Sequence, residues 1–420
     1  MPNPNGILGN RNFLLLWSGN AISLIGCYCI SISYPIIVLA MTGSPIMAGW
    51  VAFSFTLATL LLQLPAGKIA DNFNRQRILI ACQAIGMASV VLAALIAILR
   101  PPGAALLWCF TAFIEGSALV LFQICETPVV RDVVPEEHRM KAYSFFEAQQ
   151  PIAIMVGRAF GAAIADIARL LPFLVNALSY LFCLVTLFAM KDADEADPSR
   201  SVSHRPEQTK TLVIDGVRIV WRHRFLRTTT LIAGLSSMIA QMAIMLILVQ
   251  ARSYGGAAWT VAVVLGAGGI GGLIGAVAAP HLLRLFSTTT VYRCALLTWA
   301  VVFCPFAFTF DTRVLTVCWC GVGCVGTIIG VALTTVRMQV LPDHILGRAM
   351  AAIATWNAGA AALGPLTGGY LINWLGTGKT GLLIAIAMCG TAVVGLHPTT
   401  AYDPHCFRRG LPARTQQDKA

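Results

Sequence analysis

The sequence predicts an all-α membrane protein in which twelve transmembrane helices form two repeats of six. Three observations predict this class. Of the 420 residues, 57% are hydrophobic and 11% are charged, whereas soluble domains carry about 25% charged residues. The apolar residues fall into segments that mostly reach the ~17–25 residues needed to cross a bilayer. A glycine motif of the first half also returns in the second half.

Twelve apolar segments are predicted to span the membrane, six on each side of one hydrophilic stretch. In chain order they are 13–39, 45–66, 78–99, 105–125, 145–167, 172–190, 229–249, 261–283, 291–310, 314–335, 350–371 and 380–396. This pattern predicts an N-terminal bundle (1–190), a cytoplasmic linker (191–227), a C-terminal bundle (228–397) and a cytoplasmic tail (398–420). Apolar residues interleaved with arginines at 209–225 are typical of an amphipathic helix on the membrane face.

Lysine and arginine are concentrated on one predicted side of the membrane. The connections on the other side hold Arg100, Arg169, Arg252, Arg313 and Lys379. Because positive residues stay in the cytoplasm, we expect both termini to be cytoplasmic, in a bacterial inner membrane. The net charge of +11 then follows from topology, so we expect the lipid bilayer and no nucleic acid as a partner.

Neither a metal site nor an enzyme site is predicted. The 13 cysteines lie mostly within spans, where cysteine behaves as a small hydrophobe. None of the 7 histidines falls in the middle of a span, and no Walker-type nucleotide loop occurs. We therefore expect no catalytic residues and no cofactor. Transport would be driven by an ion gradient or by the substrate's own gradient.

The connection between spans two and three is short and charged. Gly67 would let two helices approach closely, and Asp71 can bond free backbone amides or a guanidinium group. Arg75 and Arg77 are typical of a cytoplasmic connection. An ordinary topogenic loop is the alternative interpretation of this stretch.

One motif occurs in both halves at the same register. Gly157 and Gly161 move onto Gly364 and Gly368 when the chain is shifted by 207 residues, and Pro365 and Gly369 complete the second copy. The same shift aligns the preceding loops, so spans four and five correspond to spans ten and eleven. A duplicated six-helix unit is the layout of an alternating-access transporter.

These motifs resemble those of major facilitator superfamily transporters. The loop at 67–77 is similar to the motif between their second and third helices, and the run from Gly364 to Gly369 resembles the antiporter motif of their efflux branch. The stretches 11–17, 42–45 and 131–135 look like the macrolide-efflux and enterobactin-exporter group of drug:proton antiporters. The resemblance implies the major facilitator fold. It also implies a cytoplasmic gate formed by Gly67, Asp71, Arg75, Arg77 and Asp132. Four residues depart from the pattern: Cys27, Asn72, Ala112 and Arg158.

Charged residues inside a span are costly and usually functional. Glu115 lies 21 residues before Glu136, at the turn between spans four and five, and Arg158 lies 22 residues after it. The two residues should share a membrane depth, which predicts an ion pair that opens when Glu115 is protonated. A permanent structural bridge, or helix faces that never meet, are the alternatives. Glu126 and Glu147, similarly matched near the inner mouth, are a second candidate proton site.

The second half has no carboxylate within a span. Its candidates for substrate binding are Gln241, Trp356 and Asn357, because an aromatic ring beside an amide suits an amphipathic ligand. A helix–helix hydrogen bond or an interfacial tryptophan is an equally good interpretation of each residue.

The function predicted from the sequence is proton-coupled efflux of an amphipathic small molecule, such as a drug, a siderophore or a secondary metabolite. The expected partners are that molecule, protons and the bilayer, and the expected state is a monomer. The alternatives are a nutrient importer on the same fold, and a sensor or scaffold that does not transport.

Overall fold

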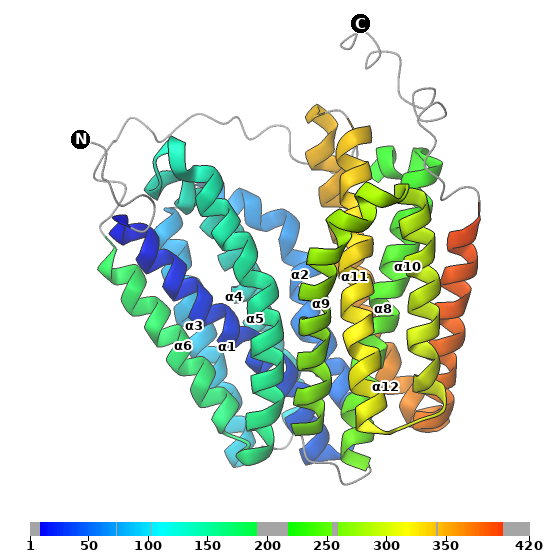
Figure 1. The fold of residues 1–420 in the computed structure, drawn as a ribbon. Helices are drawn as coiled ribbons and strands as arrows, with labels where there is room; N and C mark the ends of the chain where they lie inside the picture. The colour runs from blue at the N-terminus through cyan, green and yellow to red at the C-terminus, as the bar shows by residue number, and fades with distance from the viewer. Residues whose placement is uncertain are drawn as a thin grey trace, which may run out of the picture. The chain divides into compact units, whose positions relative to one another are not determined.

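The computed structural model describes residues 9–72, 74–101, 103–190, 217–253, 259–341 and 343–397, with side chains described except at 64–72, 253, 340, 343 and 344. Over these ranges the backbone is helical and forms no β-strand (Figure 1). Most of the expected linker and the expected tail lie outside the described residues. The surroundings of Gly67 and Asp71 are not described either.

Six long helices make up the first half of the chain. They are α1 (Arg11–Thr42), α2 (Pro45–Asn72), α3 (Arg75–Leu99), α4 (Ala104–Val133), α5 (Arg139–Ile167) and α6 (Leu171–Ala189), with a short 3₁₀ helix, η2 (Glu136–His138), before α5. The second half contains α8 (Arg224–Ser253), α9 (Trp259–Leu285), α10 (Thr288–Phe303), η6 (Cys304–Ala307), α11 (Thr312–Val340) and α12 (Asp343–Leu396).

The last helix accounts for two of the twelve predicted spans. In the described part of the chain, 11 helices are long and apolar enough to cross a membrane. With its 54 residues, α12 would extend about 80 Å at 1.5 Å per residue, far more than the ~30 Å hydrocarbon core requires. Gly376 interrupts it with a φ of 78° and a ψ of 171°, a conformation that glycine adopts at little cost. Counting both segments of α12 gives twelve spans, as predicted.

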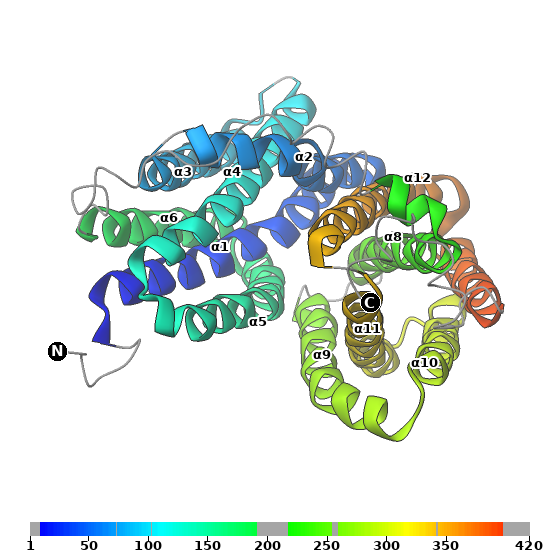
Figure 2. The same cartoon turned by 90° about the horizontal axis from the view of Figure 1, so that it is seen from above.

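The chain divides into two compact units. Unit 1 comprises residues 1–204 with 247–266, and unit 2 comprises 205–246 with 267–420. Within unit 1, α1 is central: it contacts α2, α4, α5 and α6. Figure 2 shows α1 crossing this unit with α5 on one side and α4 and α6 on the other. Within unit 2, α10 packs against α11 and α12.

Side-chain caps mark the start of two helices of unit 1, α1 and α3. The Asn10 side chain accepts a hydrogen bond from the Phe13 amide at 3.2 Å and donates one to the Val133 carbonyl at 2.9 Å. It therefore caps α1 and ties the start of that helix to the end of α4. Asn74 caps α3 in the same way, accepting from the Arg77 amide at 3.0 Å.

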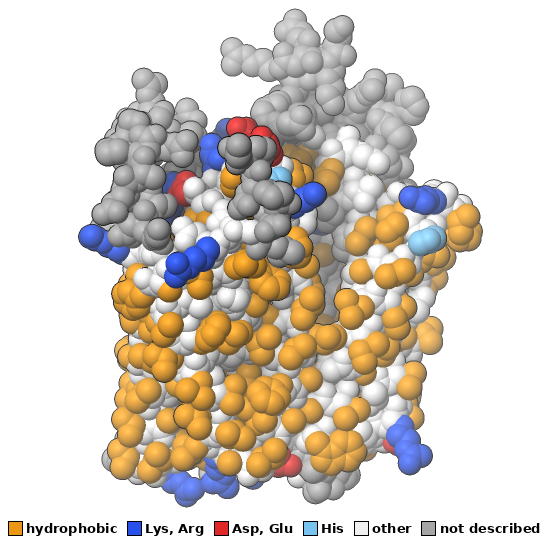
Figure 3. All heavy atoms as spheres, turned by 60° about the vertical axis from the view of Figure 1, so that its left-hand side comes forward, with side chains coloured by type: hydrophobic (Ala, Val, Ile, Leu, Met, Phe, Trp, Pro, Cys, Tyr) orange, Lys and Arg blue, Asp and Glu red, His pale blue; other side chains and the backbone are white. Residues whose placement is uncertain are grey.

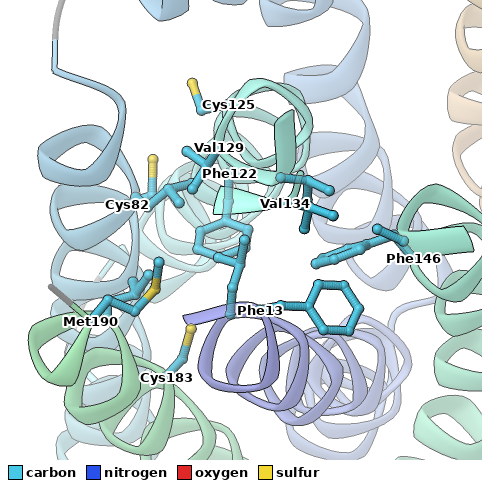
Figure 4. Close-up of a cluster of buried hydrophobic side chains, with 14 of the residues drawn as sticks. Phe13, Cys82, Phe122, Cys125, Val129, Val134, Phe146, Cys183 and Met190 are labelled. Atoms are coloured by element: carbon cyan, nitrogen blue, oxygen red, sulfur yellow. The ribbon is translucent and has the colours of Figure 1, made fainter. Parts of the chain in front are cut away.

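A buried apolar cluster lies where α1 begins and α4 ends. Phe13, Phe122 and Phe146 come from three helices and point into the same space (Figure 4). The rings of Phe13 and Phe146 meet edge to face with their centroids 6.1 Å apart, a favoured aromatic arrangement. Cys82 and Cys183 are buried in this cluster as free thiols, so they pack as small hydrophobes, as expected.

The outer surface fits a lipid environment. Figure 3 shows one face covered by hydrophobic side chains, with lysine and arginine at its upper and lower edges. Many large hydrophobic side chains are exposed, among them Leu99 at 71% and Leu106 at 77%. A hydrophobic surface of that extent would be unfavourable in water. The protein is a multi-pass membrane protein.

Candidate functional site

Glu115 is the most deeply buried carboxyl group that the structure describes. It lies in α4 and is 0% exposed. Its Oε1 atom accepts two hydrogen bonds from α6, one from Asn176 Nδ2 and one from the Tyr180 hydroxyl, both at 2.5 Å. Its Oε2 atom is also inaccessible and has no hydrogen-bond partner in the described part of the chain. Neutral donors thus hold the carboxyl group through Oε1, and Oε2 makes no hydrogen bond to a described residue.

Two glycines make room for the side chains that hold Glu115. A β-carbon added at Gly26 would lie 2.6 Å from Asn176 Oδ1, and one added at Gly86 would lie 2.6 Å from the Tyr180 ring. The next residue in α1, Cys27, has its Sγ atom 3.2 Å from the Tyr180 oxygen. Asn176 and Tyr180 were not among the residues singled out from the sequence. Their signal is a polar pair four residues apart in an apolar span, which places both on one helix face.

The predicted ion pair between Glu115 and Arg158 is not formed. Within the described ranges, the single ion pair is between Arg75 and Asp132. Both predicted partners do lie at one level of α1: Gly26 abuts the α6 group that holds Glu115, while Gly157, beside Arg158, abuts Ile25 and Tyr28. Their helices, α4 and α5, lie on opposite sides of α1, however (Figure 2). The count along the chain did not reveal that a third helix lies between α4 and α5.

Glu126 and Glu147 line one cavity of about 150 Å³ in unit 1. The other lining residues are Leu24 from α1, Gln123, Thr127 and Val130 from α4, and Tyr143, Phe146 and Gln150 from α5. Glu126 Oε2 is inaccessible and lacks a hydrogen-bond partner among the described residues, whereas Glu147 is exposed. The structure therefore brings this predicted pair of acids to one site.

Arg75 and Asp132 meet at one end of unit 1. The distance from Arg75 Nη1 to Asp132 Oδ2 is 2.7 Å, and the two side chains are 36% and 42% exposed. The pair joins the first turn of α3 to the last turn of α4. Arg77, in the same turn of α3, is exposed. Two of the five residues expected to form the cytoplasmic gate, Arg75 and Asp132, are therefore in contact, and the gate itself remains a prediction.

The two copies of the glycine motif pack in the same manner. A β-carbon at Gly161 would lie 2.8 Å from the Cys29 Cα atom of α1, and one at Gly364 would lie 2.5 Å from the Met238 carbonyl oxygen of α8. Gly157 and Gly368 continue these two contacts, while Pro365 and Gly369 are buried in α12. Each half thus uses small residues to bring the backbones of two helices together.

The candidates of the second half do not form one cluster. Gln241 lies against Gly364, whereas Trp356 lies against Gly234, which is seven residues from Gln241 along α8. Seven helical residues correspond to about 10 Å. Trp356 also meets Trp221 edge to face at 6.1 Å, and Asn357 Oδ1 is buried without a partner in the described ranges. Gln241 and Trp356 thus each pack against a glycine of a neighbouring helix, and a role in substrate binding remains a prediction.

Unit 2 buries a positive charge that sequence reasoning left out of the candidates. Arg337 in α11 is 5% exposed, and its Nε and Nη2 atoms have no hydrogen-bond partner in the parts of the chain described. The nearby Tyr292 hydroxyl is also without one. No group of three or more His, Cys, Asp or Glu side chains among the described residues is placed to hold a metal ion.

The family is decided by comparison with known proteins. The model of the Major Facilitator Superfamily matches residues 16–365. The chain belongs to that superfamily. This result confirms the resemblance drawn from the motifs and makes the protein a member of a family of transporters.

Relatives of similar length include multidrug efflux pumps named Tap. The pump from Mycolicibacterium fortuitum is 24% identical over 393 residues, which cover 90% of this chain and 92% of that protein. The pump from Mycobacterium tuberculosis H37Rv is 25% identical over 394 residues, covering 91% and 90% of the two chains.

Solved transporter structures share the fold at lower identity. The nucleoside transporter NupG superposes with a TM-score of 0.73 at 14% identity, over 93% of this chain and 100% of that chain. A bacterial homologue of the iron transporter ferroportin gives 0.69 at 13% identity, over 92% and 100% of the two chains. These likenesses confirm the predicted major facilitator fold of twelve helices in two repeats.

Proposed function

We propose that this protein exports an amphipathic small molecule, such as a drug, a siderophore or a secondary metabolite, in exchange for protons. It acts as a monomer in the bacterial inner membrane, with both termini in the cytoplasm. Its bundles, residues 1–190 and 228–397, are joined by the linker 191–227 and alternate access around a site near the middle of the membrane. The similarity to Tap efflux pumps supports the outward direction of transport.

The observation that carries this proposal is the buried carboxyl group of Glu115. A charge at mid-membrane costs at least about 2.5–3.5 kcal/mol, and the contacts of Glu115 in the described residues are the neutral donors Asn176 and Tyr180. A bound proton removes the charge. Oε1 keeps both hydrogen bonds in either state, so the proton has a defined place on Oε2. Releasing it requires contact with water, which alternating access supplies.

The position of Cys27 supports the same assignment. The exporters that this chain resembles often carry an acidic residue after the glycine at 26, and here the residue is cysteine. Cys27 touches Tyr180, which in turn donates to Glu115. The carboxyl group missing from α1 is thus replaced in the same neighbourhood by one from α4. Arg158, Glu126 and Glu147 are the remaining candidates for coupling.

The test is gradient-driven uptake into inside-out vesicles, in which an exporter moves its substrate into the lumen. A panel of fluorescent amphiphiles would be added with the lumen acidic, and then with the pH difference collapsed. Accumulation that requires the acidic lumen supports proton-coupled export. A nutrient importer would instead deplete the lumen under the same gradient, and a sensor or scaffold would transport none of the panel.

The ion pair between Arg75 and Asp132 is proposed to latch the cytoplasmic side together with Gly67, Asp71 and Arg77. Arg75→Gln or Asp132→Asn is expected to lower the export rate severalfold, because each variant leaves the opposite charge without its partner. Melting temperatures should change little, since exposed pairs are typically worth ~0–1 kcal/mol. Initial rates of dye export and thermal melts of the purified variants measure the two effects.

The control is the exchanged pair, Arg75→Asp with Asp132→Arg, which restores opposite charges at the same two positions. It should recover much of the rate if attraction between these residues closes the transporter. If the wild type and both single variants export at the same rate, the ion pair between Arg75 and Asp132 does not act as a latch.

A further inference from the structure

The cavity that contains Glu126 and Glu147 has the chemistry of a binding site for a positive charge. The nine described residues that line it include two carboxylates, two glutamines and a threonine, but no lysine, arginine or histidine. No basic side chain in the described ranges forms an ion pair with either acid. Both carboxyl groups line the same space, so a cation placed between them would be attracted by each acid that is ionised.

Glu126 supplies the buried part of this site. Its Oε2 atom is inaccessible to solvent and lacks a hydrogen-bond partner in the described structure. Burying a carboxylate oxygen without a hydrogen-bond partner costs free energy, and a bound cation would offset that cost. Glu147 lies across the cavity on α5 and is exposed, so it stands on the solvent side of the same space.

The aromatic residues favour an organic cation. Tyr143 and Phe146 line the cavity beside the acids, and aromatic faces attract ammonium groups, quaternary ones included. A calcium ion would instead need six to eight oxygen ligands at about 2.3–2.6 Å, and no group of three or more His, Cys, Asp or Glu side chains among the described residues is placed to hold a metal ion.

The size of the cavity limits what enters it. Sites that enclose a whole drug-sized ligand usually have volumes of about 300–1,000 Å³, and this one is about 150 Å³. It is large enough for a charged head group but not for a complete amphiphile. The apolar body of the ligand must therefore lie outside the cavity.

We propose that the Glu126–Glu147 cavity binds the ammonium head group of the exported molecule, so that the substrates are cationic amphiphiles. The proposal rests on the proposed function, since it names the substrate class of that exporter. Glu126, half-buried with an inaccessible Oε2 atom, is the counter-ion, Glu147 attracts the cation at the entrance, and Tyr143 with Phe146 provides the aromatic wall. Glu115 is left to carry the proton and does not touch the substrate.

The experiment measures equilibrium binding to the purified full-length protein in an uncharged detergent, with no membrane gradient. The probe is the 6-phenylhexyl-trimethylammonium ion, and 6-phenylhexanol is the uncharged comparison. Glu126→Gln is expected to weaken binding of the cation by about tenfold or more, since it removes a buried counter-charge. Glu147→Gln should weaken it less, and the alcohol should be unaffected by either change. The control is Glu137→Gln, the same substitution at an exposed acid.

A second measurement needs no variant. Mass spectrometry would map carbodiimide modification of carboxyl groups in the wild-type protein, and the cation should protect Glu126 while the alcohol does not. The proposal is overturned if the cation and the alcohol respond alike, if Glu137→Gln weakens binding as much as Glu126→Gln, or if millimolar magnesium displaces the probe more effectively than sodium. Gradient-driven export by a protein that fails these binding tests would leave the proposed function intact and remove only the substrate class.

Discussion

Replacing Glu115 with glutamine is expected to give a folded protein that no longer accumulates its substrate against a gradient. Glutamine keeps an oxygen for the hydrogen bonds from Asn176 and Tyr180, but it cannot take up or release a proton. A difference of one pH unit is worth about 1.4 kcal/mol, so each exchanged proton supports about tenfold accumulation. We expect wild-type vesicles to reach that ratio and the variant to remain near unity.

The variant should still exchange substrate down its own gradient, because the binding site is not altered. Counterflow of labelled substrate in the same vesicles measures that exchange. Glu137→Gln is the matched control, since it makes the same change at an exposed position of η2. If the Glu115 variant accumulates substrate normally, the coupling role passes to Glu126 or Glu147.

Counting from the turn at Glu136 placed Glu115 and Arg158 at one level but did not predict whether the two side chains face each other. The α6 residue Asn176, which holds Glu115, packs against Gly26 of α1, and Gly157, next to Arg158, packs against Ile25 and Tyr28 of the same helix. Whether Glu115 and Arg158 face each other depends on which helix lies between them. That is decided by the close packing of Gly157 and Gly161 on α1, a tertiary contact that spacing along the chain does not reveal.

The partners of Glu115 were missed for a similar reason. Asn176 and Tyr180 are ordinary residues for a membrane span, and their polar groups become informative only beside a carboxyl group from another helix. The twelve spans were predictable, by contrast, because the length of an apolar segment is set by the thickness of the bilayer. The Glu126–Glu147 site was predictable because both acids lie near the turn that joins α4 to α5, where little freedom is left to separate them.

The second large effect is expected from the glycines that join helix backbones. An added β-carbon would lie 2.8 Å from Cys29 Cα at position 161, and 2.5 Å from the Met238 carbonyl oxygen at position 364. Backbone atoms cannot move aside without shifting a helix, and overpacking of this kind typically costs about 1–3 kcal/mol. Gly161→Ala and Gly364→Ala should therefore lower the melting temperature of the purified protein and reduce export.

A graded series tests whether contact with the neighbouring helix is the cause. At Gly368 the nearest atoms to an added β-carbon are 3.3 Å away, so Gly368→Ala should cost less than Gly364→Ala. At Gly330 and Gly390 no atom lies within 4 Å, and alanine there should be neutral or stabilising by up to about 1 kcal/mol, because glycine is a poor helix former. If the melting temperatures of all five variants fall equally, close helix packing is not the cause of the loss. The motif would then have no special role in joining α5 to α1 and α12 to α8.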